Sequence, residues 1–310
     1  MKDKKVIFMG TPEFSVPVLE MLIKECNVVM VVSQPDSRVG RHQELRNTPV
    51  KECALKYGIE VFQPVKIREE YQYILDKNPD VIITCAYGQI IASILLDTPK
   101  YKAINVHASL LPKLRGGSPL HRCLIDGYSE TGVTIMYMAP GMDDGDIITQ
   151  RSIEILDTYN VGDIHDKLSV LGSELLFDTL PSIFDGTNGR IKQDESLVTF
   201  AYNIKKEEEK LDFSKSAFEV HNHIRGLYPF PTSYTTLNNE IIKICESRIG
   251  EVKSGKCGEI VSVYEEGLGV MCNDREIIIT RLKPAGKKEM SARDFVNGRG
   301  KDKLLGEILC

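Results

Sequence analysis

Residues 101–112 read YKAINVHASLLP, an apolar strand pattern that ends in polar side chains and a proline. Side chains two residues apart in a strand point to the same face, so Asn105 and His107 project together while Val106 packs on the other side. Pro112 ends the strand because it cannot donate a backbone hydrogen bond to a sheet. Polar groups at the carboxyl end of a buried strand lie where open α/β sheets bind ligands. The stretch therefore predicts an α/β sheet with a ligand site at this edge.

Strands and helices alternate on both sides of this stretch. Short apolar runs predict strands at residues 6–9, 28–32, 60–62 and 81–85 before it, and at 131–138 and 147–155 after it. Helical periodicity is present at residues 14–24, 49–57, 67–76 and 161–184. This alternation favours an α/β fold with a Rossmann-like, mostly parallel sheet that helices cover on both faces.

The residues beyond 213 follow a different pattern. One helix is expected at 216–225, and short β-rich runs follow at 232–236, 240–247, 258–264, 267–271 and 276–282. Such a series of short strands favours a small OB-like β-barrel, a fold often used to bind oligonucleotides. The prediction is a catalytic domain at 1–204, a charged linker at 205–212 and a C-terminal barrel domain at 213–310.

The composition excludes several classes of protein. With 310 residues and a net charge of −5, the chain has room for about two domains and is not a strongly basic nucleic-acid binder as a whole. No apolar run approaches the ~20 residues that span a bilayer, and the apolar start at 6–9 is too short for a signal peptide. A cytoplasmic protein is therefore expected.

Cysteine and histidine spacing gives no sign of a metal site. None of the eight cysteines forms a Cys-x-x-Cys pair, which indicates reduced, mostly structural thiols. His221 and His223 form the only close histidine pair, without cysteine or carboxylate residues at the spacing of a zinc site. No metal is predicted.

Asn105, His107 and the turn GMDDGD at residues 141–146 together suggest a chemistry. An amide and an imidazole side by side can donate hydrogen bonds to an oxygen that becomes negative. A carboxylate beside the imidazole, for which Asp143 is the candidate, can orient the ring and take up a proton. This set suits acyl-type transfer through a tetrahedral intermediate. The same residues also fit a simpler interpretation, in which the pair is satisfied at a strand end and Asp143 is only a turn residue.

A dinucleotide-binding domain begins in a similar way, but its fingerprint is missing here. The first turn, MGTPEF at residues 9–14, lacks the G-x-G-x-x-G pattern, and no P-loop sequence is present. Glu13 would also repel a pyrophosphate at the start of the following helix. The turn therefore argues against a nicotinamide or flavin enzyme.

Basic residues gather near the C-terminus of an acidic chain. From Lys210 onward there are 16 basic and 14 acidic residues, so the preceding residues carry the negative charge. Eight basic residues lie between Arg281 and Lys303, against three acidic ones. Such a patch fits contact with a phosphate backbone, and it equally fits an ordinary solvated face.

Ten short stretches match one known family. They are GTPEF at 10–14, QPD at 34–36, GR at 40–41, PVK at 49–51, NVHASLLP at 105–112, RG at 115–116, ETGVT at 130–134, GMDDGD at 141–146, KKEE at 205–208 and PFP at 229–231. On these stretches, nearly the whole chain resembles the methionyl-tRNA formyltransferase family. The Asn-x-His…Asp core alone is shared by folate-dependent formyltransferases in general, so the other stretches make the resemblance specific.

The resemblance implies a Rossmann-like catalytic domain and a C-terminal barrel that holds tRNA. It implies transfer of the formyl group of 10-formyltetrahydrofolate to the α-amino group of methionyl-initiator tRNA, for translation initiation. Methionyl-initiator tRNA and the folate are the expected partners, no membrane is involved, and a monomer is expected. An alternative is a folate-dependent formyltransferase that acts on an amino sugar nucleotide with the same catalytic core.

The resemblance also assigns roles to individual residues. The catalytic residues it implies are Asn105, His107 and Asp143. The folate-binding segment it implies consists of Ser109, Leu110, Leu111 and Pro112. The residues expected to bind tRNA are Arg38, Arg41 and Arg46 in the loop at 34–47, together with Lys283, Lys287 and Lys288 in the basic C-terminal patch.

Two stretches depart from the family pattern. A lysine pair often follows Gly-Arg in the family's acceptor-stem loop, whereas HQE follows Arg41 at residues 42–44, and Glu44 weakens the positive charge of the loop. GGS at residues 116–118 stands where Gly-Ala-Ala is more usual.

Overall fold

The chain folds as two compact units in a computed structural model that describes residues 1–39 and 43–310. The first unit comprises Met1–Pro119, Thr131–Ile153 and His165–Ala201. The second comprises Leu120–Glu130, Glu154–Ile164 and Tyr202–Cys310. The domain limits inferred from the sequence, with a linker at 205–212, stay a prediction.

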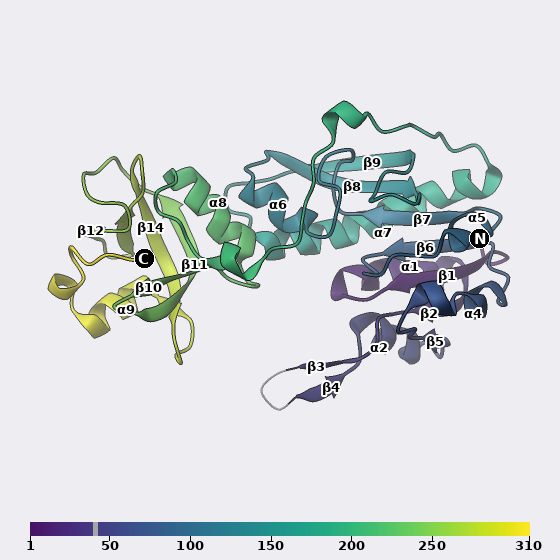
Figure 1. Ribbon diagram of the computed structural model, residues 1–310, viewed down its shortest axis with the longest axis horizontal. Helices are drawn as coiled ribbons and strands as arrows, with labels where there is room; N and C mark the ends of the chain where they lie inside the picture. The colour runs from purple at the N-terminus through teal and green to yellow at the C-terminus, as the bar shows by residue number, and fades with distance from the viewer. Residues whose placement is uncertain (40–42) are drawn as a thin grey trace. The chain divides into compact units, whose positions relative to one another are not determined.

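The first unit is built on a seven-stranded sheet in the order β5-β2-β1-β6-β7-β8-β9 (Figure 1). Its strands are β1 (Lys5–Gly10), β2 (Asn27–Val32), β5 (Val61–Phe62), β6 (Val81–Cys85), β7 (Ala103–His107), β8 (Glu130–Tyr137) and β9 (Ile147–Glu154). The first five strands of this order pair in parallel, and β8 runs antiparallel to β7. The predicted Rossmann-like, mostly parallel sheet is confirmed. Strand order reverses between β1 and β6, and such sheets bind ligands beyond the strand ends at this point.

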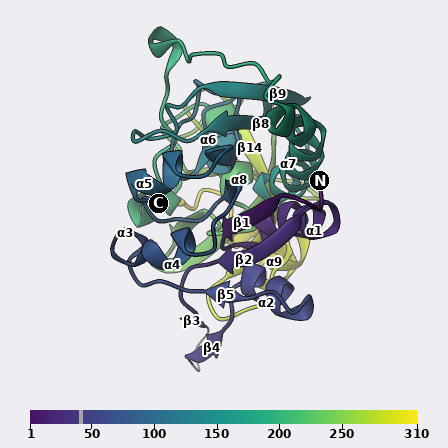
Figure 2. The ribbon, with the colours of Figure 1, turned by 90° about the vertical axis from the view of Figure 1, so that its right-hand side faces the viewer.

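Helices cover both faces of this sheet, because its central strands are apolar on both sides. On one face lie α1 (Val16–Glu25) and α7 (Val161–Asp185), and on the other lie α3 (Ile67–Glu70), α4 (Gln72–Leu75) and α5 (Ser93–Asp97) (Figure 2). Gly172 of α7 lies against the side chain of Val106. Val106 therefore packs under a helix, and the alternation of β7 directs Asn105 and His107 to the opposite face.

The structure adds local elements that the sequence patterns did not predict. The helix expected at 67–76 is divided into α3 and α4 at Tyr71. A hairpin of β3 (Ser37–Val39) and β4 (Glu44–Arg46) occupies part of the loop at 34–47. By contrast, α2 (Pro49–Lys56) begins where predicted, because Thr48 caps it by accepting a hydrogen bond from the backbone of Lys51 at 3.2 Å.

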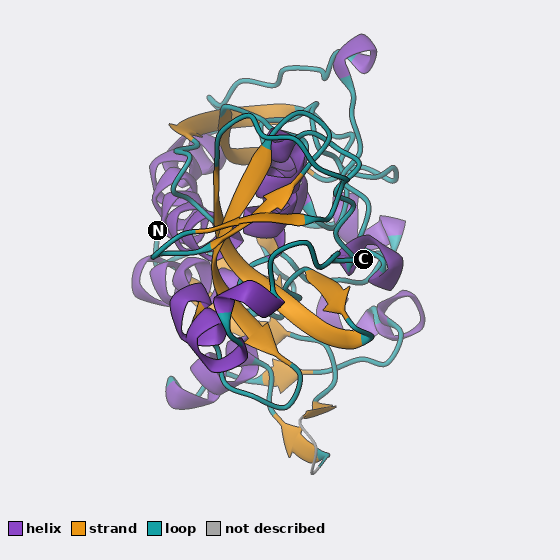
Figure 3. Cartoon of the chain, turned by 90° about the vertical axis from the view of Figure 1, so that its left-hand side faces the viewer, coloured by secondary structure: helices purple, strands orange, loops and turns teal. Residues whose placement is uncertain are grey.

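The second unit contains an antiparallel sheet in the order β10-β11-β14-β13-β12, with β15 paired to β14 (Figure 3). Its strands are β10 (Tyr234–Leu237), β11 (Glu240–Ile249), β12 (Ile260–Val263), β13 (Leu268–Met271), β14 (Glu276–Pro284) and β15 (Met290–Ser291). The last residues bridge its two edges. Cys310 exchanges backbone hydrogen bonds of 2.8 and 3.0 Å with Thr236 of β10, and Ile260 of β12 donates to Glu307 at 2.9 Å. The predicted β-barrel is thus a half-barrel whose edges this segment joins.

Two further helices pack on this half-barrel. Ser216 caps α8 (Ala217–Leu227) with Glu219 in a reciprocal capping box, as the predicted helix start requires. The basic stretch after residue 291 contains α9 (Ala292–Arg299), which the sequence patterns did not predict. The rings of His221 and His223 on α8 have separate partners, the hydroxyl of Ser247 at 3.0 Å and the backbone carbonyl of Glu208 at 2.6 Å.

The cysteines behave as the sequence predicts for structural thiols. Six of them are buried, and only Cys257 and Cys310 are exposed. Burial raises the pKa of the Cys85 thiol to about 12, so that this thiol stays protonated at neutral pH. None of the helices within residues 1–39 and 43–310 has both the length and the apolar character that a membrane span requires.

Candidate active site

Asn105 and His107 lie at the carboxyl end of β7, beside β6. Asp143 lies in the loop between β8 and β9, and its Oδ2 atom is 3.6 Å from Nδ1 of His107. Both side chains are largely shielded, with 7% of the histidine and 20% of the aspartate exposed. The structure therefore brings together the imidazole and the carboxylate that the sequence analysis singled out.

The second nitrogen of the His107 ring has a partner of its own. Nε2 lies 3.1 Å from the backbone carbonyl of Leu114. A carbonyl only accepts hydrogen bonds, so Nε2 carries a proton in this contact. A second proton, on Nδ1, would lie between the ring and the carboxylate of Asp143. The contact with Leu114 thus fixes the ring, and Nδ1 faces the carboxylate of Asp143 at 3.6 Å without a hydrogen bond between them.

Two backbone features hold Asp143 in place. The backbone N–H of Gly116 donates to Oδ2 of Asp143 at 2.9 Å. Gly145 approaches the carbonyl oxygen of Tyr137 so closely that a Cβ atom at this position would lie 1.8 Å from it. The glycine in the turn is therefore required for the loop to pack against β8, which explains one residue of the GMDDGD stretch.

Thr84 on β6 orients the amide of Asn105. The two residues are paired in the β6·β7 register, and the Thr84 hydroxyl donates to Oδ1 of Asn105 at 2.8 Å. With its oxygen occupied in this way, the amide presents Nδ2, its donor group, to a ligand. Thr84 is not among the residues predicted from the sequence, although a threonine within the otherwise apolar stretch VIITC at 81–85 is a signal of a buried polar contact.

We predict that Thr84→Val lowers kcat about 10-fold, because a lost hydrogen bond of about 1–1.5 kcal/mol lets the amide of Asn105 rotate. The measurement is steady-state turnover with saturating substrates. Thr131→Val is the matched control, since both threonines are 2% exposed and the Thr131 hydroxyl has no hydrogen-bond partner among the described residues. Equal kcat values for the two variants would show that Thr84 does not orient Asn105.

The segment expected to bind folate divides into two kinds of residue. Ser109 is fully buried and donates to the backbone carbonyl of Lys113 at 2.7 Å, while Leu111 packs in a small apolar cluster with Met136. These two side chains hold the segment in shape. Leu110 and Pro112 are only partly buried. They are therefore the side chains of the segment with surface to offer a ligand.

The arginines of the loop at 34–47 do not share one surface. In the β3·β4 hairpin, Arg38 pairs with Leu45 and Arg46 pairs with Ser37, so the two arginines point to opposite faces. Glu44, two residues before Arg46 in the same strand, shares the face of Arg46. The negative charge noted in the sequence therefore offsets Arg46 more than Arg38. Arg41 lies outside the described residues.

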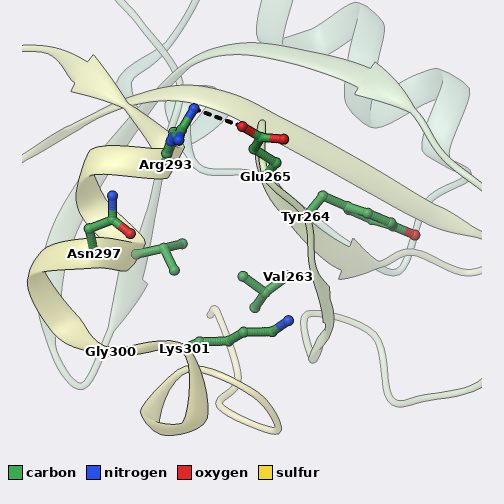
Figure 4. Close-up of a pocket in the computed structure, with 8 residues that line it drawn as sticks. Val263, Tyr264, Glu265, Arg293, Asn297, Gly300 and Lys301 are labelled. Carbon is green, nitrogen blue, oxygen red and sulfur yellow. Dashed lines mark ion pairs between the residues drawn. The ribbon is translucent and has the colours of Figure 1, made fainter.

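The basic C-terminal patch also divides, into paired arginines and unpaired lysines. Arg281 pairs with Glu289 at 2.6 Å, Arg299 pairs with Glu240, and Arg293 pairs with Glu265 at 2.9 Å beside a cleft of about 450 Å³ (Figure 4). Within the described part of the chain, Lys283, Lys287 and Lys288 have no ion pair, and all three are exposed. The lysines are therefore the side chains whose charge is free to meet an anion.

Comparison with known proteins identifies two family domains. Residues 4–180 match the formyl transferase domain, and residues 203–300 match the formyl transferase C-terminal domain. Methionyl-tRNA formyltransferase from Staphylococcus epidermidis is 49% identical over 98% of this chain and 99% of its own length. The enzyme of the same name from Bacillus cereus is 50% identical over 95% of each chain.

A solved structure shares the fold at lower identity. The N-formyltransferase from Helicobacter canadensis, in complex with folinic acid and dTDP-3-aminofucose, is 22% identical, with a TM-score of 0.68 over 89% of this chain and 98% of its own. At this identity the likeness concerns the fold alone. The relatives that are about half identical over almost the whole length decide the assignment: the chain belongs to the formyltransferase family and, within it, to the methionyl-tRNA formyltransferases.

Proposed function

We propose that this protein transfers a formyl group from 10-formyltetrahydrofolate to the α-amino group of methionyl-initiator tRNA, with Asn105, His107 and Asp143 as its catalytic residues. The observation that carries the proposal is the His107–Asp143 contact of 3.6 Å, on the strand where the amide of Asn105 presents its donor group. Relatives of that name, 49–50% identical over nearly the whole chain, support the choice of acceptor.

The proposed reaction begins with the neutral methionyl amine, whose lone pair attacks the formyl carbon. A new C–N bond forms and the formyl oxygen becomes negative. Nδ2 of Asn105 and an N–H group at Nδ1 of His107, the ring nitrogen that Leu114 does not engage, donate hydrogen bonds to this oxygen. Asp143 takes up the proton that the attacking nitrogen loses. The bond between the formyl carbon and the folate nitrogen then breaks, and that nitrogen takes up the proton that Asp143 has accepted.

A folate donor is supported by the segment after β7. Ser109 and Leu111 hold this segment beside the catalytic residues, and Leu110 and Pro112 retain apolar surface for a flat ring system. The fold is that of a protein solved with folinic acid. Transfer from a folate carrier needs no protein nucleophile, and the reaction proposed above uses none.

Contact with the tRNA backbone is proposed for the unpaired lysines. Lys283 lies directly opposite Lys243 in the β11·β14 ladder, where like charges repel each other, and Nζ of Lys243 donates to the carbonyl oxygen of Pro231 at 2.7 Å. A phosphate group placed at this pair would relieve the repulsion. In the β3·β4 hairpin, the face that carries Arg38 has no carboxylate among the paired residues. We therefore assign Arg38 a second contact with the tRNA backbone.

For this contact we predict that Lys283→Gln, Lys287→Gln and Lys288→Gln each weaken tRNA binding. Each lysine that contacts a phosphate should make the slope of log K against log salt less negative by about 1. The measurement is tRNA affinity at a series of salt concentrations. Arg293→Gln changes the net charge equally, but its guanidinium is already paired with Glu265, so its slope should stay near that of the unchanged protein. Unchanged slopes for all three lysine variants would contradict the assignment.

One assay tests the proposed function as a whole. Labelled 10-formyltetrahydrofolate is supplied with methionyl-initiator tRNA, with an amino sugar nucleotide, or without an acceptor. Label on the tRNA alone is the expected result. Label on the sugar nucleotide instead would overturn the choice of acceptor while keeping the chemistry, and label in neither product would overturn both.

A further inference from the structure

The side chain of Gln193 lies against the backbone of the loop that carries Asp143. Its Nε2 atom donates to the carbonyl oxygen of Asp143 at 2.7 Å and to that of Gly145 at 2.8 Å. A primary amide has two N–H donors, so one nitrogen satisfies both carbonyls. Gln193 therefore connects two backbone carbonyls of the turn, one of which belongs to Asp143, the residue that faces His107.

Arg115 settles which end of the Gln193 amide faces the loop. Its Nε atom lies 3.0 Å from Oε1 of Gln193, and a guanidinium only donates hydrogen bonds. The amide oxygen must therefore face Arg115, which leaves the nitrogen for the two carbonyls. All three hydrogen bonds are satisfied in one orientation and lost in the other.

Arg115 is itself held rigidly. It is 4% exposed, and its guanidinium pairs with Glu195 at 2.8 Å. Its backbone forms hydrogen bonds of 2.9 and 2.7 Å with Thr199 and Ala201, so the segment around Gln193 runs beside it. The next residue, Gly116, donates to the carboxylate of Asp143. Arg115 thus connects both supports of the catalytic loop.

The Asp143 loop needs such support, because its conformation is not one that the chain adopts readily. Asp143 has φ +49°, in the left-handed region, which aspartate adopts more often than most residues but which is still uncommon outside glycine. Such conformations persist when surrounding contacts hold them. Gln193 supplies two of these contacts, one at Asp143 itself.

We propose that Gln193 is a positioning residue that sets the place of the Asp143 carboxylate relative to His107, acting through the loop backbone rather than through the substrates. The proposal rests on the function proposed above, in which Asp143 takes up a proton. It assigns a role to a residue that lies outside the stretches by which the family was recognised.

The test uses Gln193→Met, which keeps the length of the side chain and removes its donors. We expect kcat to fall about 10- to 100-fold, as for a small misplacement of a catalytic group, while KM for both substrates changes less than about 3-fold. Gln193→Glu is the second variant, since it keeps an acceptor for Arg115 but also lacks the donors, and it should show the same loss. Gln72→Met, on the exposed face of α4, is the matched control and should leave kcat unchanged.

A double-mutant cycle with Asp143→Asn separates this inference from the proposed function. If Gln193 acts through Asp143, Gln193→Met should lower kcat by less than about 2-fold when Asp143→Asn is already present. Full additivity of the two losses, or normal kcat in a folded Gln193→Met variant, would overturn the role of Gln193. Normal kcat in Asp143→Asn alone would instead overturn the proposed role of Asp143. Thermal unfolding of each variant identifies any loss that comes from unfolding.

Discussion

Replacing Asn105 or His107 with alanine should lower kcat about 100- to 1,000-fold, the usual loss of one preorganised donor to an oxyanion, or about 2.7–4 kcal/mol. The structure explains why water cannot take over this role easily. The Asn105 amide is held by Thr84, and the His107 ring is held between Leu114 and Asp143, so both donors have set directions. A water molecule in the space left by alanine has no such orientation.

Single-turnover formylation of methionyl-initiator tRNA measures this loss directly. The affinity for tRNA should change less than about 3-fold in both variants, because neither side chain lies in the basic patch. Asn188→Ala is the matched control for Asn105, because each asparagine accepts a hydrogen bond from a hydroxyl group. His165→Ala is the matched control for His107, because each histidine lies beside a carboxylate. Turnover close to that of the controls would remove both residues from the mechanism.

Asp143→Asn should lower kcat about 100-fold or more, a loss within the range attributed to general acid–base groups. Asp144→Asn should change kcat less than 2-fold. The sequence stretch alone does not separate these neighbours. In the structure, the Asp143 carboxylate lies at His107 and accepts from Gly116, while Asp144 is exposed and folds back over Gly141. An amide at position 143 keeps the shape of the side chain but cannot take up the proton.

The pH dependence of single-turnover rates distinguishes the chemical role of Asp143 from a structural one. The Asp143→Asn variant should become more dependent on pH above neutrality, because solvent hydroxide then replaces the missing base. A variant that is slower by a constant factor at every pH would point to misplacement of His107 instead. Equal rates for the two asparagine variants would show that the choice between Asp143 and Asp144 is wrong.

Much of the fold was predictable because the signals are local. Buried strands such as β1, β2 and β6 are short apolar runs between helix-forming or turn-forming residues, and their limits agree with the prediction to within one residue. Elements without an apolar pattern were missed. The β3·β4 hairpin is exposed and charged, and α9 lies within a stretch whose basic residues indicated only a surface patch.

The sequence by itself determined the chemistry of the edge of β7. The two-residue period of a strand places Asn105 and His107 on one face. Pro112 and the glycines of the GMDDGD turn at 141–146 indicate loops beside this face. These features depend on residues that are close together in the chain, so they can be recognised from the sequence. The family resemblance, which also depends on linear stretches, supplied the reaction and its acceptor.

Only the tertiary structure decided how these groups are held. Thr84 orients Asn105 from the neighbouring strand, Gln193 reaches the Asp143 loop from a segment some 50 residues later in the chain, and carboxylates neutralise the arginines but not the lysines of the basic patch. Each of these contacts joins residues that are distant in the chain. Their geometry follows from the packing of whole elements, and no local period or spacing in the sequence encodes it.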